Sequence, residues 1–220
     1  MTAPLTMPDG VATEYFEPER VDAVSPRSDG RVTGVSVGFP LWRARWTLGQ
    51  AMDRATSEQW RAFVARLRGV QRTFFAYDHG RPYPLAAIKG FTGLTRHGGG
   101  AFDGTASSWS VNSDRDTPTL NGLPSTFPLT FGDYMMWRWT TGGEARRSLH
   151  RVVVPATASG GVVSPVVEPP LPTFIPSDAV ADLARPNCIM RLVPGETRVG
   201  EKGRTLRVDA TIVAIQDLRD

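Results

Sequence analysis

The clearest helical pattern in the sequence spans residues 57–68, and it limits the folds that the chain can adopt. Apolar side chains recur there at positions i, i+3, i+4 and i+7, which is the spacing of one helix face. A helix of about three turns is marginal alone in water, so this face must pack against another element. We therefore predict one helix that covers a face of a β-sheet. Its structural core consists of Trp60, Phe63, Val64 and Leu67.

Both ends of this helix carry signals in the sequence. Thr56 or Ser57 is the expected N-cap, since Gln59 follows Thr56 by three residues as in a capping box. Gly69 is the expected stop, because helices commonly end on a left-handed glycine. Three arginines lie off the apolar face and are candidate oligomer contacts: Arg61, Arg66 and Arg68.

Most of the remaining sequence has the pattern of strands and turns. From Val35 to Leu41, apolar side chains alternate with small or polar ones, which predicts a half-buried strand. The apolar phase slips by one residue near Pro40, which indicates a bulge or bend in a long strand, or a turn between two strands. The 22 glycines and 18 prolines are spread along the chain, which favours many turns over a disordered region. Further strands are predicted at 70–77, 128–139, 148–155, 162–168, 189–193 and 205–215, and a helical turn at 178–183.

The charge pattern argues against a dedicated nucleic-acid-binding protein. The net charge is only +3, and the arginines are scattered among acidic residues rather than gathered in one stretch. Only Lys89 and Lys202 are lysines, so nearly all of the positive charge is arginine. That excess reflects either a GC-rich genome or interfaces at which guanidinium groups pair with carboxylates. We expect no specific nucleic acid as a partner.

Cysteine usage and hydropathy predict a soluble chain that folds in a reducing cytoplasm. Cys188 is the one cysteine, so no intramolecular disulfide can form. Residues 1–10 lack the basic start and apolar run of a signal peptide. No apolar stretch is long enough to span a bilayer, and we expect no membrane partner.

Motifs that would carry catalysis are weak. Residues 34–38 match G-x-S-x-G, but Ser36 lies in a β-branched run and no helix pattern follows, as a hydrolase would need. His79, His97 and His150 are not at metal-binding spacing, and no phosphate-binding loop is present. The carboxylates are scattered, and nothing singles out a pair for glycoside cleavage. We predict no enzymatic activity, no cofactor and no metal site.

Two tryptophans fall on one face of a predicted strand. Trp137 and Trp139 share that face, with Met136 and Arg138 on the other. We expect the tryptophan face to belong to a core. The alternative is a surface that stacks on sugars or contacts a partner protein, and Trp109 would be a further residue of such a surface.

Several short stretches occur together in an informative order. They are WRA (42–44), EQWRAFVARLRG (58–69), QRTF (71–74), FGDY (131–134), LHRV (149–152), VVEPPL (166–171) and MRL (190–192). In this order they resemble the minor and distal tail proteins of tailed bacteriophages. Each stretch alone is weakly specific, and their shared order carries the resemblance. Residues 1–30 and 93–126 match nothing in the family pattern.

The resemblance implies a mostly-β fold in two parts. Residues 31–95 and 196–220 would form a β-sandwich with one packed helix, and residues 96–195 would form an inserted small β-barrel-like domain. Residues 1–30 would be an extended N-terminal arm. The resemblance also implies a homo-oligomeric ring, commonly a hexamer, that joins the tail tube protein to the tip hub protein. Such a protein is made in the host cytoplasm and ends in the virion, at the tail tip.

The sequence leaves two other functions open. One is a carbohydrate-binding module that recognises host surface glycan through exposed tryptophans. The other is a peptidoglycan-cleaving enzyme, which a tail tip can also carry. The candidate glycan contacts are Trp109, Trp137 and Trp139.

Overall fold

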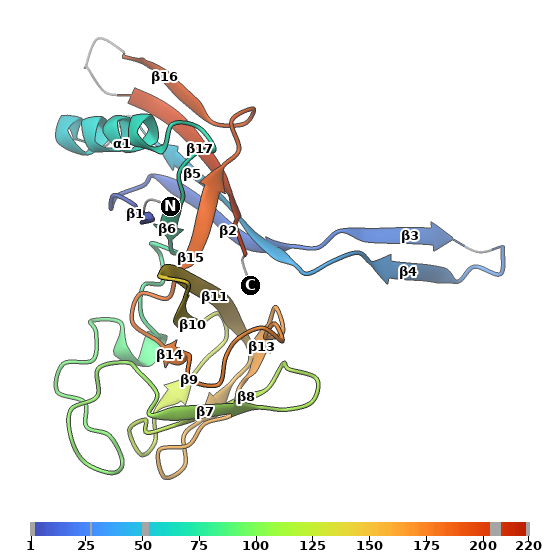
Figure 1. The fold of residues 1–220 in the computed structure, drawn as a ribbon, viewed down its shortest axis with the longest axis vertical. Coiled ribbons are helices and arrows are strands. Elements are labelled where there is room, and N and C mark those ends of the chain that lie inside the picture. The colour runs from blue at the N-terminus through green and yellow to red at the C-terminus, as the bar shows by residue number, and fades with distance from the viewer. Residues whose placement is uncertain (1–2, 27, 50–52, 203–207, 219–220) are drawn as a thin grey trace.

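The computed structural model describes residues 3–26, 28–49, 53–202 and 208–218. These residues form seventeen strands, one α-helix and one short 3-10 helix, so the chain is mostly β, as the sequence predicts. Figure 1 shows two parts, one above the other, and a hairpin that projects sideways between them.

The first part is built on a seven-stranded sheet that takes strands from both ends of the chain. Six strands lie in the order β1-β6-β15-β17-β5-β2, and β16 pairs with the beginning of β17. β1 and β6 are parallel, and the other pairs are antiparallel. The strands are β1 (Leu5–Thr6), β2 (Thr13–Glu19), β5 (Leu41–Leu48), β6 (Phe74–Ala76), β15 (Cys188–Leu192), β16 (Arg198–Lys202) and β17 (Val208–Gln216).

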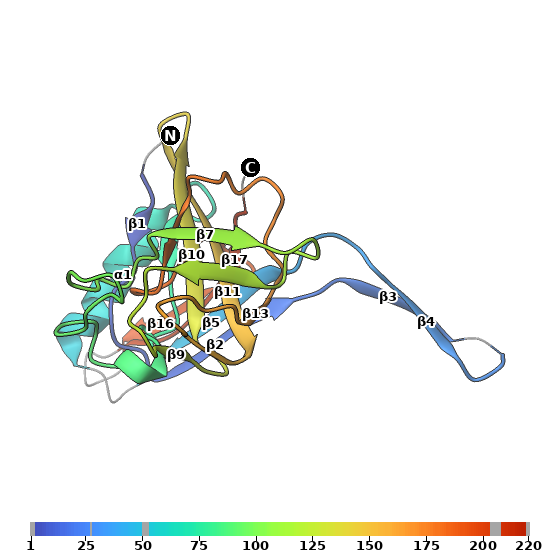
Figure 2. The same ribbon diagram turned by 90° about the horizontal axis from the view of Figure 1, so that it is seen from below.

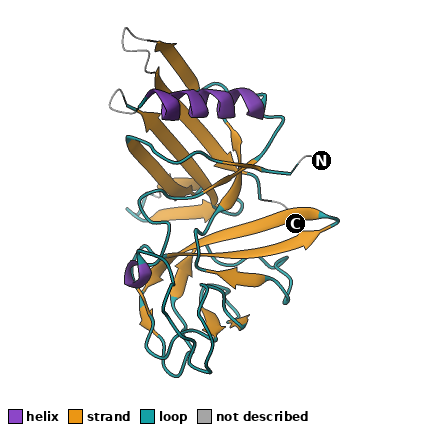
Figure 3. Ribbon diagram, turned by 90° about the vertical axis from the view of Figure 1, so that its left-hand side faces the viewer, coloured by secondary structure: helices purple, strands orange, loops and turns teal. Residues whose placement is uncertain are grey.

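The helix α1 (Arg54–Leu67) crosses one face of this sheet (Figure 3). It begins earlier than the sequence predicts, because Asp53 is the N-cap and its carboxylate accepts a hydrogen bond from the amide of Thr56 at 2.8 Å. Aspartate caps a helix as well as serine or threonine does. The helix ends as predicted. Arg68 is left-handed with φ of 50°, and Gly69 follows with φ of 66°, in the region that favours glycine.

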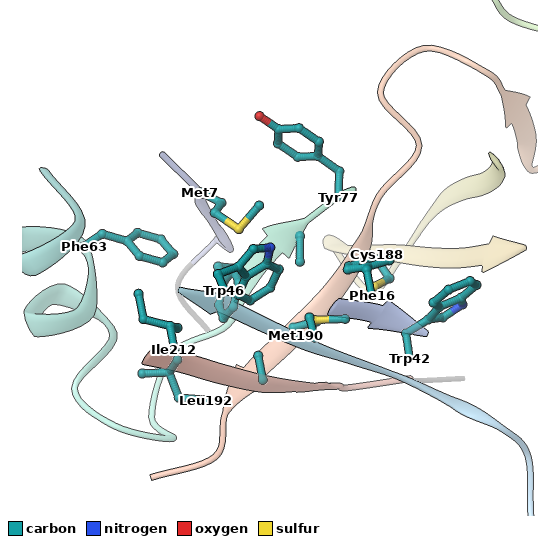
Figure 4. Packing of buried hydrophobic residues seen from close by; sticks show 14 of the residues in the cluster. Met7, Phe16, Trp42, Trp46, Phe63, Tyr77, Cys188, Met190, Leu192 and Ile212 are labelled. Atoms are coloured by element: carbon teal, nitrogen blue, oxygen red, sulfur yellow. The ribbon is translucent and has the colours of Figure 1, made fainter. Parts of the chain in front are cut away.

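The apolar face of α1 packs on the sheet as predicted. Trp60, Phe63 and Leu67 are buried, and Val64 is partly buried at the edge of the same core. The Phe63 ring meets the Phe74 ring edge-on, with their centroids 5.2 Å apart. Figure 4 shows Phe63 pointing from the helix into the buried side chains of the sheet. The helix is therefore held by tertiary packing rather than by its own propensity.

The second part contains a four-stranded antiparallel sheet in the order β13-β11-β10-β14, with the two-stranded sheets β7-β8 and β9-β12 beside it. Among the described strands these sheets remain separate, so the barrel-like closure that was expected here is not observed. The elements are the 3-10 helix η1 (Leu85–Ala87), β7 (Ser108–Val111), β8 (Pro118–Asn121), β9 (Pro128–Leu129), β10 (Tyr134–Thr141), β11 (Glu144–Val154), β12 (Ala156–Thr157), β13 (Val166–Glu168) and β14 (Val180–Asp182).

Strand β10 contributes to two hydrophobic cores. Tyr134 and Met136 belong to the first core, which lies under α1. Met135, Trp137 and Trp139 belong to the second core, inside the second part. Successive side chains of a strand point to opposite faces, so one strand can serve both cores. The prediction that Trp137 and Trp139 share a core face is confirmed.

Several predicted boundaries are corrected by the structure. Residues 1–30 are not an arm throughout, because β1 and β2 lie in the first sheet and Phe16 on β2 is buried. The range 96–195 is too long for the inserted part at its end, because β15 pairs with β6 and β17 in the first sheet. The predicted range 96–195 also starts too late, because Ala87 already belongs to the second core. Residues 178–183 contain the strand β14 rather than a helical turn.

Candidate functional site

The segment between β2 and β5 leaves the body of the protein as a long hairpin. β3 (Asp22–Pro26) pairs antiparallel with β4 (Val32–Ser36), and the amide of Val37 donates to the carbonyl of Val21 at 2.7 Å. Figures 1 and 2 view the molecule from perpendicular directions, and both show the hairpin extending away from the sheets. We call residues 21–26 and 28–37 the valine hairpin.

The local sequence explains why this hairpin forms. β4 is rich in β-branched residues, which favour extended backbone, and β3 contains Val24. The turn contains Gly30, whose φ of 80° favours glycine, and the Asp29 carboxylate accepts a hydrogen bond from the Arg31 amide at 3.0 Å. Asp and Gly are both residues that turns favour. Ser36 of the G-x-S-x-G match ends β4 and is exposed, and β5 follows instead of a helix.

Valine side chains are exposed on both faces of the hairpin. The register places Val24 and Val32 on one face, and Val21, Val35 and Val37 on the other. Their exposed fractions lie between 59% and 70%. The prediction of a half-buried strand is therefore wrong for Val35 and Val37, whereas Leu41 begins β5, in which buried side chains alternate with more exposed ones. An antiparallel hairpin usually packs one apolar face on its own core, whereas no described residue of this chain covers either face.

The backbone edges of the hairpin are also free. Within the described part of the chain, β3 pairs only with β4. An open edge offers unpaired N–H and C=O groups to another strand, and a lone two-stranded hairpin is marginal in water. Covering the exposed valines would contribute about 1.5 kcal/mol for each side chain that becomes fully buried. The valine hairpin therefore has the properties of a surface that another protein covers.

A buried polar cluster ties β2 to the segment that follows β6. One carboxylate oxygen of Glu14 accepts a hydrogen bond from the Trp46 indole at 2.6 Å, and the other accepts from the His79 amide at 2.9 Å. Burial lowers the pKa of His79, but the hydrogen bond and charge of Glu14 outweigh it, so the pKa is raised overall. Burial, reinforced by the charge of Glu14, also raises the pKa of Asp78. This cluster joins two parts of the first sheet that are far apart in the sequence.

A groove of about 460 Å³ runs along β2 beside this polar cluster. Two of its walls carry arginines, and both arginines have acidic partners within the chain. Arg151 lies 2.6 Å from Glu17, and Arg81 lies 3.3 Å from Asp133. Carboxylates of the same chain thus balance the charges of both arginines in the groove, without an external anion.

Ser148 and His150 form a hydrogen-bonded pair inside the second part. Ser148 Oγ lies 2.8 Å from His150 Nε2, and His150 Nδ1 lies 2.6 Å from the Pro169 carbonyl oxygen. A carbonyl only accepts, so Nδ1 carries the proton and Nε2 accepts from the serine hydroxyl. Burial lowers the pKa of His150 to about 4. Both side chains are enclosed, so a substrate cannot reach the hydroxyl unless the core opens. We assign this pair a packing role.

The tryptophans considered for glycan binding lie in or against the second core. Trp137 is completely buried, and Trp139 is 9% exposed. The Trp109 ring packs edge-on against Trp137 at 5.5 Å, and its indole N–H donates to the Ala179 carbonyl at 2.7 Å. A stacked sugar needs an exposed ring face, so these residues serve the core instead. The sequence-based reason for a glycan-binding module is thereby removed.

The arginines of α1 lie on a different surface from the hairpin. Arg66 and Arg68 are exposed, and Arg61 is half-buried. Figures 1 and 2 place α1 and the valine hairpin on opposite sides of the molecule. The structure therefore offers two separate candidate contact surfaces. The remaining loop histidine, His97, has its Nδ1 3.0 Å from Ser125 Oγ.

The described part of the chain has no helix long and apolar enough to cross a membrane. It also has no group of three or more histidine, cysteine, aspartate or glutamate side chains that could hold a metal ion. No protein-family model matches the sequence, and no curated protein is significantly similar to it. Among the surfaces described above, the valine hairpin is the one whose apolar side chains are exposed on both faces.

Proposed function

We propose that this chain is a structural protein of a bacteriophage tail tip, and that it assembles with copies of itself into a ring through the valine hairpin. In the virion the ring would join the tail tube protein to the tip hub protein. The exposed hairpin is the observation that carries the self-association. The place in a phage tail is supported by the ordered sequence stretches that resemble distal tail proteins.

The hairpin supports self-association because of what it leaves uncovered. Apolar surface gathered on one projecting element marks interaction sites in soluble proteins. Here both faces and both backbone edges of the element are open, within the residues that the structure describes. A neighbouring chain could bury the valines and pair with an edge in one contact, as in strand addition.

The placement of the hairpin is compatible with a ring. A hairpin that is received by a different surface of the next copy makes the contact heterologous, whereas two hairpins that paired with each other would give a symmetric dimer. Heterologous contacts generate closed rings when the rotation between copies closes. The side opposite the hairpin carries α1 and its arginines, and it supplies a second, distinct surface. The resemblance implies six copies in such a ring.

The first test is the mass of the purified protein in solution by light scattering, with negative-stain images of the same peak. We expect a closed ring with an open central channel, since a phage tail passes DNA along its axis. A monomer at every concentration would contradict self-assembly. A compact particle without a channel would contradict the place in a tail.

The hairpin's role is tested by replacing Val24, Val32 and Val35 with serine. We expect monomers that remain folded, because these side chains are more than 60% exposed within their own chain. Val154→Ser is the matched control, since Val154 is 51% exposed at the end of β11, outside the hairpin. A triple variant that still forms the parent ring shows that the contact lies elsewhere.

A further inference from the structure

A cavity lined by arginines lies where the tip of the β10–β11 hairpin meets the first sheet. Its volume is about 390 Å³, and its walls come from the segment after α1, from the β10–β11 tip and from β15. These walls contain no residue of the valine hairpin. The polar residues that matter for its chemistry are Arg72, Thr73, Thr140, Glu144, Arg146 and Arg191.

Two of these arginines are fixed in place by partners. Arg191 Nε donates to an Asp217 carboxylate oxygen at 2.7 Å, and Arg191 Nη1 donates to the Val70 carbonyl at 2.5 Å. Arg146 Nη1 donates to a Glu144 carboxylate oxygen at 2.8 Å. Their guanidinium groups are thus held in position at the cavity wall, and their charges are largely balanced.

Two further arginines form no ion pair among the described residues. Arg72 lines the cavity, is half-buried, and makes no side-chain hydrogen bond or ion pair in that part of the chain. Arg147 follows Arg146, and its guanidinium stacks over the Phe75 ring at 5.1 Å. The Nε atom of Arg147 is buried without an acceptor, and its Nη1 donates to the Arg146 carbonyl at 2.9 Å. Arg147 is not among the residues that line the cavity, and the charge of Asp182 acts on it. Arg72 is a partly buried cation at the cavity wall without a counter-charge, so an anion from outside would stabilise it.

We propose that this cavity binds the carboxylate of an acidic peptide segment from a neighbouring protein, with Arg72 as the principal contact. The planar guanidinium group matches a carboxylate with two parallel hydrogen bonds. The hydroxyl groups of Thr73 and Thr140 add hydrogen-bonding capacity at the wall. This inference goes beyond the ring, because it needs neither the valine hairpin nor a second copy of this chain.

The composition of the walls favours a peptide over a nucleotide. No aromatic side chain is among the described residues that line the cavity, so a base would have no stacking partner. Pro4, Ala145 and Ile189 provide apolar wall for the aliphatic part of an acidic side chain. The carboxylate of Glu144 at the wall disfavours a doubly charged phosphate more than a singly charged carboxylate. The volume lies at the small end of ligand sites, which suits one or two side chains.

The test is a calorimetric titration of the full chain with an end-capped triglutamate peptide, and with the triglutamine peptide for comparison. We expect the triglutamate peptide to bind, the triglutamine peptide to bind at least tenfold more weakly, and added salt to weaken the binding. Arg72→Gln should reduce the affinity at least tenfold, and Arg72→Lys should reduce it less, because the charge remains while the planar fork is lost.

The matched control is Arg45→Gln, which removes the charge of an exposed arginine on β5 outside the cavity. It should leave the affinity within twofold of the parent. Arg72→Gln should melt like the parent, because the Arg72 side chain has no partner to lose in the described structure. Equal binding of the two peptides, or unchanged affinity in Arg72→Gln, would overturn the proposal. Inorganic phosphate that binds as tightly as the triglutamate peptide would also overturn it, since the site would then be a general anion site.

Discussion

Trp60 connects the helix to the sheet and to the N-terminal segment. Its ring is fully buried, 6.5 Å from the Trp46 ring, and its indole N–H donates to the Gly10 carbonyl at 2.9 Å. We expect Trp60→Ala to lower the free energy of unfolding by about 3–5 kcal/mol, because it leaves a large cavity and an unpaired carbonyl. Urea unfolding measures this. Arg61→Ala is the neighbouring control and should change stability by less than about 0.5 kcal/mol.

His150 makes the stability of the protein depend on pH in the acid range. Burial holds its pKa at about 4, below the ordinary 6.5. Between these values the unfolded chain binds a proton that the folded protein does not. Its contribution is therefore complete above pH 6.5 and is lost as the pH falls toward 4. We expect a loss of up to about 3 kcal/mol over this interval, measured by urea unfolding on either side of it.

Substitutions separate this effect from those of the other histidines. His150→Gln should flatten the dependence, because it removes the buried imidazole. His79 acts in the opposite direction, because its pKa is raised in the folded protein. Its contribution is complete at low pH and is lost as the pH rises through that raised pKa. A His150→Gln protein that still loses stability as steeply as the parent contradicts the assignment.

At the scale of elements, the valine hairpin is separable from the fold that carries it. Its valines are mostly exposed, so replacing residues 22–36 with an Asn-Gly turn should leave a folded body that melts at the same temperature as the monomeric variant with serine at positions 24, 32 and 35. Differential scanning calorimetry measures this. The control is the same replacement in the β7–β8 hairpin, whose Trp109 and Leu120 pack on the second core. That control should melt at a much lower temperature, and equal melting of all three proteins would contradict the distinction.

The elements differ in how far the sequence could predict them. The face of α1 was predictable, because Trp60, Phe63 and Leu67 follow the helix period and a short amphipathic helix must pack. The start of α1 was not predictable, because three residues near its N-terminus have side chains that can act as the N-cap. The exposure of the hairpin was not predictable, because alternating valines give the same sequence pattern whether their own chain or another protein covers them. The polar cluster could not be found, since Glu14 and His79 lie 65 residues apart and only the sheet brings them together.

At the scale of the whole molecule, the two parts should unfold together. β10 contributes alternate side chains to both cores. In addition, two ion pairs join the second part to β2 and to the residue that follows it. These pairs are Arg151–Glu17 and Arg20–Glu168, each at 2.6 Å. We expect a single calorimetric transition. Leu123→Ala, in the second core, should lower the melting temperature of both parts, with a cost of about 2–5 kcal/mol.

Amide hydrogen exchange shows whether the destabilisation by Leu123→Ala reaches the first part. Amides of β17, in the first sheet, should lose protection in Leu123→Ala although they lie outside the second core. Leu85→Ala, which truncates an exposed side chain of the second part, should leave the protection of β17 as it is. Two separate transitions, or a β17 that remains fully protected, would show that the parts are independent.

The shared strand β10 has a consequence for how such proteins can diversify. A domain that is merely attached can be exchanged between genes as a unit, and its host keeps its own interior. Here an exchange of the second part would also remove Tyr134 and Met136 from the interior of the first. Recombination that keeps the first core intact must therefore leave β10 and β11 in place and exchange only the loops of the second part. New versions of the second part must arise by changes that preserve the side chains of β10 that face the first core.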